Sequence, residues 1–180
     1  MTGADGQMRA LDPAEMLDLA ERGAGMGPAR RALLTLRAYH PDADPDAIAA
    51  AALSARDRAL LAARARQFGA RMTAQDACGA CGAQIELTLR AEDIGLGPRP
   101  GEARIPPDAL DAALEALDPD AAVELSLACP VCGQTSLRAF DAAAFFWREL
   151  EARAPRLLLD VAELARAFHW SERDILALPP

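Results

Sequence analysis

The chain has 180 residues, enough for one domain or for two small domains that share an interface. It carries 19 basic and 27 acidic side chains, a formal charge of −8 at pH 7, which argues against nucleic-acid binding because phosphate contacts need a positive surface. The hydrophobic fraction is 52%, but alanine supplies much of it and aromatic residues are only 4%. Composition therefore predicts helix more than a dense core.

The order of charged and apolar residues also argues against a secreted protein and against a membrane protein. The N-terminus lacks a basic flank followed by an apolar run, and no stretch of about 18 uncharged apolar residues occurs, so we expect neither a secretory signal nor a membrane partner. We expect a cytoplasmic protein, with association with a larger particle as a further option. In that compartment cysteines stay reduced, and metal or redox roles are more common than disulfides.

Proline and glycine divide the first 77 residues into predicted helices. The run Asp12-Pro13-Ala14-Glu15 combines an N-cap, a proline at the first helical position and an acid three residues after the cap. It predicts a helix that ends at Gly23. A second helix is expected from Pro28 to Tyr39, and a short alanine-rich helix begins at Asp46.

A longer, basic helix is predicted from Ser54-Ala55-Arg56-Asp57, a pattern close to a capping box. Asp57 is its single acid, against five arginines that extend to Arg71. This helix is either a solvated surface or a docking face for an acidic partner. On the second interpretation the candidate partner-binding residues are Arg56, Arg58, Arg64 and Arg66.

The character of the sequence changes at Cys78. Polar and apolar residues alternate in Gln84–Arg90 and in Val123–Leu127, which is the period of a half-buried strand, and Thr135–Phe140 shows a weaker alternation. Between the first two strands we expect a glycine- and proline-rich loop and a short helix over residues 106–117. The middle of the chain is therefore predicted to be a small sheet with an insertion.

The chain is predicted to be helical again after Asp141. An apolar stripe at helical spacing predicts a core-facing side, formed by Leu157, Val161, Leu164 and Phe168. Pro155 is expected to kink this helix or to split it near Arg153. Ser171 has the position of an N-cap and predicts a last short helix.

The four cysteines give the clearest chemical signal. They form the pairs Cys78-Gly79-Ala80-Cys81-Gly82 and Cys129-Pro130-Val131-Cys132-Gly133. Two cysteines three apart at a tight turn can hold one face of a metal, and the following glycine permits the left-handed conformation that this turn needs. Two such pairs supply four thiolates, the ligand set of structural zinc. We therefore predict one Zn²⁺ bound by Cys78, Cys81, Cys129 and Cys132.

The separation of the pairs leaves alternatives open. Cys81 and Cys129 are 48 positions apart, more than the roughly 15–20 of a compact zinc motif, and the predicted loop and helix account for the excess. The other interpretations are unliganded thiols or two unrelated pairs, a rubredoxin-like iron site, and a thioredoxin-like redox pair. The last needs a cysteine pair that opens a helix, whereas both pairs here lie beside strands.

Three segments resemble a family of small proteins from contractile-tail phages and related injection systems, described as T-even-phage-type baseplate hub assembly chaperones or baseplate proteins. The first segment precedes the first cysteine pair, the second follows the second pair, and the third is near the C-terminus: Gln67–Arg71, Phe140–Leu150 with its Phe145-Phe146-Trp147 run, and Ala167–Leu178. The resemblance implies a structural or assembly role at a baseplate, with baseplate or tail proteins as partners.

The sequence thus predicts a mostly α protein with a small inserted β zinc ribbon, an α+β fold. Its regions are a helical segment over 1–77, the ribbon over 78–140 and a helical arm over 141–180. We expect no enzyme, because no catalytic motif is present and four thiolates leave zinc no open position. Trp147 and Trp170 join the arginines as candidate partner-binding residues. The alternatives are a zinc-ribbon regulator associated with nucleic acid and a rubredoxin-like electron carrier.

Overall fold

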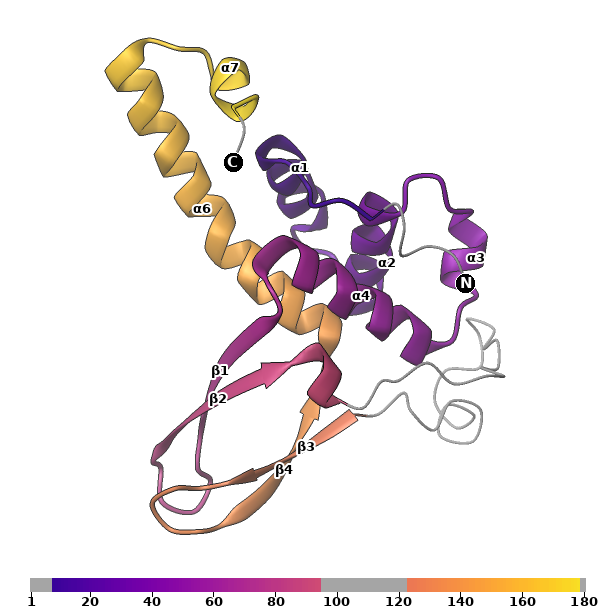
Figure 1. The fold of residues 1–180 in the computed structure, drawn as a ribbon, viewed down its shortest axis with the longest axis vertical. Helices are drawn as coiled ribbons and strands as arrows, with labels where there is room; N and C mark the ends of the chain where they lie inside the picture. Colours follow the sequence, from indigo (N-terminus) through magenta and orange to yellow (C-terminus); the bar gives the residue numbers. More distant parts are fainter. Residues whose placement is uncertain (1–7, 95–122, 179–180) are drawn as a thin grey trace. The chain divides into compact units, whose positions relative to one another are not determined.

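The computed structural model of the chain describes residues 8–94 and 123–178. Helices precede and follow two small antiparallel sheets along the chain, so the fold is of the α+β class (Figure 1). The chain divides into two compact units. One comprises residues 1–43 and 143–180, and the other comprises residues 44–142. The predicted helix over 106–117 lies outside the described residues.

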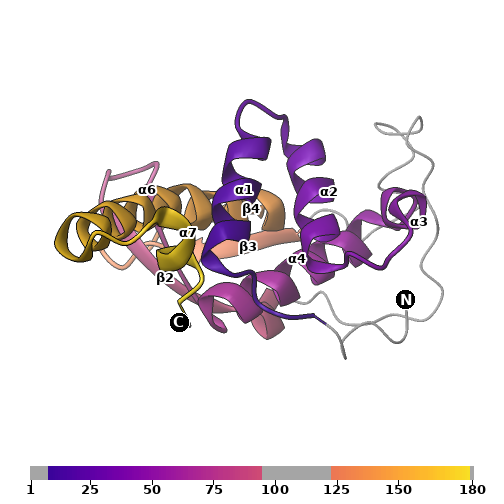
Figure 2. The same cartoon turned by 90° about the horizontal axis from the view of Figure 1, so that it is seen from above.

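The first unit is helical. It contains α1 (Pro13–Gly23), α2 (Pro28–Tyr39), nearly all of α6 (Ala142–Phe168) and α7 (Glu172–Leu176). Figure 2 shows α1 and α2 side by side. The N-terminus of α1 has the predicted capping box, in which the Asp12 carboxylate accepts from the Glu15 N–H and the Glu15 carboxylate accepts from the Asp12 N–H. Ser171 caps α7, as predicted.

Trp147 is the centre of packing in this unit. Its side chain is 2% exposed, and its indole N–H donates to the hydroxyl of Thr35 on α2 over 3.0 Å. The guanidinium of Arg31 lies 4.7 Å from the indole centroid and also forms an ion pair with Glu151. Burial of an indole is favourable only when its N–H finds an acceptor, so Thr35 completes the contact between α2 and α6.

Helix α6 runs through Pro155 without interruption, so the predicted split near Arg153 is wrong. A proline removes only one backbone hydrogen bond, and the hydrogen bonds of the remaining turns keep a long helix continuous. The predicted core stripe is only partly correct. Val161 is buried, Leu157 and Leu164 are half-buried, but Phe168 is 56% exposed because it ends the helix beyond the packed turns.

The second unit joins helices to the sheets. Its helices are α3 (Pro45–Ala49), α4 (Leu53–Phe68) and the short 3₁₀ helix η2 (Ala91–Ile94). Its strands are β1 (Arg71–Ala77), β2 (Gln84–Arg90), β3 (Val123–Ala128) and β4 (Thr135–Phe140). Strand β1 pairs with β2, and β3 pairs with β4, each as an antiparallel hairpin. Strands β2, β3 and β4 lie where the alternation of polar and apolar residues predicted them.

Two features of the second unit differ from the sequence prediction. Helix α4 begins one residue before Ser54, and its N-cap is Ala52, which has no side chain to accept a hydrogen bond. Ser54 is buried inside the first turn instead of capping it. Strand β1 was not predicted, because its inward positions, the buried Met72 and the half-buried Ala74 and Asp76, give a weak apolar alternation. Within the described residues, no helix is long and apolar enough to cross a bilayer.

Candidate metal centre

Each cysteine pair lies in the turn of one hairpin, and the two turns are built alike. In the β1–β2 turn the Cys78 N–H donates to the Ala83 carbonyl and the Gly82 N–H donates to the Cys78 carbonyl, each over 2.8 Å. In the β3–β4 turn the same two bonds run from Cys129 to Gln134 and from Gly133 to Cys129, each over 2.9 Å. Two sequence-distant segments therefore present their thiols in one geometry.

The glycine after each pair is required by the backbone. Gly82 has φ +72° and Gly133 has φ +73°, in the left-handed region that residues with a Cβ rarely adopt. A Cβ at either position would meet no other atom within 4 Å, so the requirement is conformational and not one of space. The spacing CxxCG therefore encodes the turn as well as the ligands.

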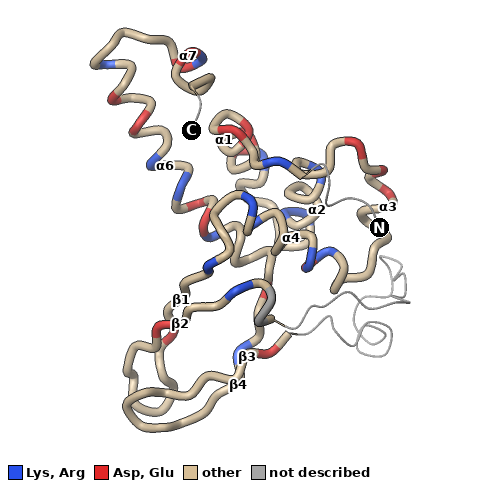
Figure 3. Tube along the Cα trace, viewed as in Figure 1, with Lys and Arg blue, Asp and Glu red and all other residues tan. Residues whose placement is uncertain are grey.

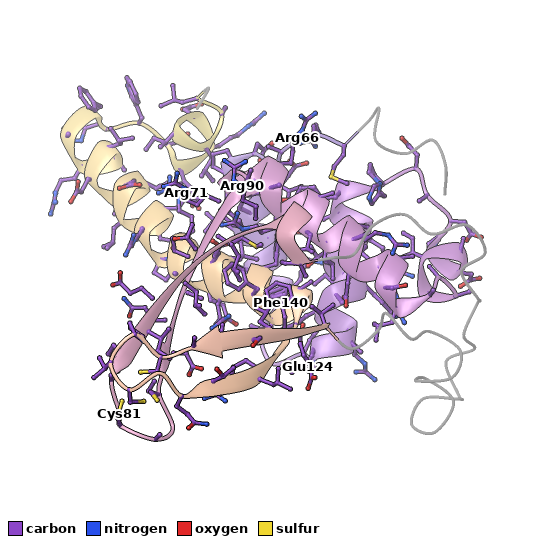
Figure 4. The ribbon with its side chains drawn as sticks, turned by 60° about the horizontal axis from the view of Figure 1, so that its bottom comes forward. Arg66, Arg71, Cys81, Arg90, Glu124 and Phe140 are labelled. Atoms are coloured by element: carbon purple, nitrogen blue, oxygen red, sulfur yellow. The ribbon has the colours of Figure 1, made fainter. Side chains whose placement is uncertain are left out.

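The four thiols converge on one point. All four sulfur atoms lie within 4.8 Å of one another, and two cross-hairpin distances, Cys78 Sγ to Cys132 Sγ and Cys81 Sγ to Cys129 Sγ, are 3.7 Å (Figure 4). A tetrahedron with metal–sulfur bonds of about 2.3 Å has edges of about 3.8 Å. A disulfide needs about 2.05 Å, so the sulfurs are spaced for a shared metal and not for a cross-link. Together these cysteines could hold one metal ion.

The backbone prepares the first thiol of each pair for ionisation. The N–H groups of Cys81 and Ala80 point at the Cys78 sulfur and lower its pKa to about 6. The N–H groups of Cys132 and Val131 likewise lower the pKa of Cys129. Hydrogen bonds to a thiolate favour the charged form, which is the form that binds metals.

Cys81 shows the opposite balance. The backbone N–H of Ala83 lowers its pKa, but the neighbouring sulfur of Cys132, partial loss of solvation beside the other thiols, and the sulfurs of Cys129 and Cys78 raise it to about 12. Several negative charges cannot share so small a volume without a compensating cation. A cation bound among the four sulfurs would therefore favour full ionisation of the cluster.

The surroundings of the cluster are partly apolar and partly ionic. Cys78 and Cys129 are buried with Ile85, and Ala83 and Leu87 pack against them, whereas the second cysteine of each pair is exposed. Away from the turns, Arg138 Nε of β4 donates to Asp76 Oδ2 of β1 over 2.5 Å. The hydrogen bond from Arg138, and then that from the Ala77 N–H, lowers the pKa of Asp76. The thiols and this ion pair both connect the two hairpins.

The predicted partner-binding residues do not form one face. Arg66 is exposed and Arg56 and Arg58 are half-buried, but Arg64 is only 3% exposed and donates from Nη1 to the Gly69 carbonyl at the end of α4. Arg64 thus stabilises a helix terminus, and its predicted exposed role is wrong.

The two tryptophans differ in the same way. Trp147 is buried, which corrects its prediction as a partner-binding residue. Trp170 is 45% exposed, and its ring stacks on Phe168 with centroids 4.9 Å apart. The two residues therefore differ in burial. The sequence indicates the burial of Trp147, because this residue ends the most apolar run of the helical arm, and it has no comparable signal at Trp170.

Sequence reasoning also missed residues that support the cluster. Asp76 and Arg138 were not singled out, although each lies within a few residues of a cysteine pair. A CxxCG turn needs a strand on both sides, so the strand that carries Asp76 could have been inferred from the turn. The pairing of Asp76 with Arg138 depends on the tertiary fold and has no sequence signal.

Comparison of the chain with protein-family models, with curated proteins and with solved structures finds no match.

Proposed function

We propose that Cys78, Cys81, Cys129 and Cys132 bind one Zn²⁺ with a structural role, so that the β1–β2 and β3–β4 hairpins form a zinc ribbon. The convergence of the four sulfurs within 4.8 Å, with two cross-hairpin distances of 3.7 Å, carries this proposal. Four protein thiolates fill the coordination shell and leave no position for water or substrate. The metal therefore holds two hairpins together, and it takes no part in a reaction.

The matching experiment is metal analysis of the purified protein together with cysteine variants. We expect one zinc per chain in the wild type, and loss of that zinc in the double variant Cys129→Ser/Cys132→Ser. Val131→Ser changes the same turn at a side chain that is 72% exposed, and it should retain the metal. If the purified protein is red and contains iron, the site is the rubredoxin-like alternative and not a zinc site. A wild-type protein without any bound metal would contradict the proposed metal site.

We further propose that the protein is a non-enzymatic assembly factor or structural component of a phage-like contractile-tail baseplate. The resemblance over Gln67–Arg71, Phe140–Leu150 and Ala167–Leu178 supports this role. The exposed, stacked rings of Phe168 and Trp170 lie in the third of these segments and suit contact with a tail protein. On this proposal the zinc ribbon keeps the fold intact while the C-terminal segment contacts the partner.

Co-purification from the native operon, followed by mass spectrometry, tests this role. We expect identified tail or baseplate proteins with the wild type and a several-fold lower yield of them with Trp170→Ala, because hot-spot aromatics dominate interface energies. Arg173→Ala alters the neighbouring helix at an exposed residue and should leave the yield unchanged. Enrichment of nucleic acid in place of tail proteins would favour the regulator alternative.

A further inference from the structure

The four cysteines differ in their access to solvent. Cys78 and Cys129 are 5% and 3% exposed, whereas Cys81 and Cys132 are exposed. Figure 4 shows Cys81 at the outer end of the hairpins. Each pair therefore has an inner thiol, Cys78 or Cys129, and an outer thiol, Cys81 or Cys132, and a reagent from solvent meets the outer thiol first.

Two sulfur–sulfur contacts join one hairpin to the other. Cys81 Sγ in the β1–β2 turn lies 3.7 Å from Cys129 Sγ in the β3–β4 turn. Cys132 Sγ in the second turn lies 3.7 Å from Cys78 Sγ in the first. Each contact thus places the outer thiol of one hairpin beside the inner thiol of the other. An accessible thiol next to a second thiol is the arrangement in which a sulfenic acid is converted to a disulfide.

We propose that Cys81 and Cys132 are oxidised by hydrogen peroxide, and that the products are two cross-hairpin disulfides, Cys81–Cys129 and Cys78–Cys132. The outer thiolate attacks one oxygen of the peroxide, the O–O bond breaks, and hydroxide leaves while a sulfenic acid forms on the outer sulfur. The inner thiolate then attacks this sulfur, the S–O bond breaks, and a second hydroxide leaves. Each disulfide transfers two electrons to one peroxide, so two peroxides oxidise the whole cluster.

The packing around the inner thiols favours bonds between the hairpins. Cys78 and Cys129 lie in one buried apolar cluster with Ile85, so the inner thiols of both hairpins are held together. The ion pair of Arg138 with Asp76 joins the hairpins at a second point. A disulfide bond is about 2.05 Å long, so each 3.7 Å contact has to close by about 1.7 Å.

Oxidation also removes the reason for binding a metal. Neither turn has a charged side chain over residues 78–83 or 129–135, and Figure 3 shows both turns in tan. Four thiolates in these turns need a bound cation to balance their charge, whereas two disulfides are neutral and have no thiolate to offer a metal. The release of Zn²⁺ on oxidation follows, and this consequence rests on the proposed zinc site. The disulfides then take over the connection between the hairpins.

The test treats the full chain with two equivalents of hydrogen peroxide, blocks the remaining thiols with N-ethylmaleimide and digests the protein with trypsin. Cleavage after arginine leaves the first cysteine pair in peptide 72–90 and the second pair in peptide 105–138. Cross-hairpin disulfides link the two peptides, whereas a disulfide within a pair leaves them separate. We expect linked peptides, with Cys81 joined to Cys129 and Cys78 to Cys132 by fragmentation mass spectrometry. Separate peptides, unreacted thiols or sulfinic acids would overturn the proposal.

Two double variants test the role of the outer thiols. Cys81→Ser/Cys129→Ser keeps the contact of Cys132 with Cys78, whereas Cys81→Ser/Cys132→Ser keeps only the two inner thiols. Both variants lose two of the four metal ligands, so they are matched in that respect. We expect peroxide to link the peptides at least tenfold faster in the first variant, because only that variant has an exposed thiol. Equal rates would contradict oxidation at the outer thiols.

Zinc release is measured separately with a chromogenic chelator. We expect peroxide to release one zinc per chain and to leave a higher midpoint of thermal unfolding than removal of zinc by EDTA, because the disulfides keep the hairpins joined. Zinc that stays bound after both disulfides have formed would contradict the release. Absence of zinc from the untreated protein would contradict the proposed function, and the linkage of the two peptides would still decide the present proposal.

Discussion

Gly23, the last residue of α1, lies against the six-membered ring of Trp147. A Cβ added at Gly23 would be 1.9 Å from Trp147 Cη2, far inside the closest approach of carbon atoms. The indole cannot move away easily, because it is buried and its N–H is held by Thr35. Glycine is therefore required here by packing, which differs from the backbone requirement at Gly82 and Gly133.

This contact predicts that Gly23→Ala destabilises the protein. Overpacking of a well-filled core costs about 1–3 kcal/mol, and urea unfolding should show a loss of that size. The matched control is Gly27→Ala, at the N-cap of α2, where an added Cβ meets nothing within 4 Å and the backbone is extended. Its loss should be about 0.5–1 kcal/mol, from the poorer N-cap that alanine makes, and smaller than that of Gly23→Ala. Equal losses in the two variants would contradict the role given to the indole.

At the scale of elements, local signals located most of the secondary structure. Asp12, Ser171 and the alternation in Gln84–Arg90 each act through neighbours in sequence, so they could be recognised without a fold. The split at Pro155 was wrongly predicted because the proline removes a single backbone hydrogen bond, while the other turns of α6 keep theirs. Strand β1 was missed because Met72 is the one large apolar residue among its inward positions, and because the strand pairs with the strand that follows the cysteines.

The candidate site shows the same division between local and distant information. The ligands and the glycines of each turn follow from the CxxCG spacing, because a turn is a local structure. The contact of Asp76 with Arg138 joins strands 62 residues apart and could not be read from spacing. Burial also depends on tertiary packing, which is why Arg64 and Trp147 were placed at the surface although both lie inside.

For the whole molecule, the division into two units predicts an uneven response to metal removal. Each hairpin has only two strands, and such hairpins are marginally stable alone. The sulfur cluster and the Arg138–Asp76 ion pair connect them, so loss of the proposed zinc should release the hairpins. Both tryptophans belong to the helical unit and report on it separately.

Excess EDTA should therefore lower the midpoint of thermal unfolding that is measured by circular dichroism in the strand region. The unfolding midpoint measured by tryptophan emission should change little. The stability lost is about 4 kcal/mol if free zinc had been a thousandfold above its dissociation constant. Added Zn²⁺ should restore the midpoint, and Mg²⁺ should not, because thiolates prefer soft or borderline metals. An unchanged midpoint would show that the metal has no structural role, and a parallel shift of the emission would show that the two units unfold together.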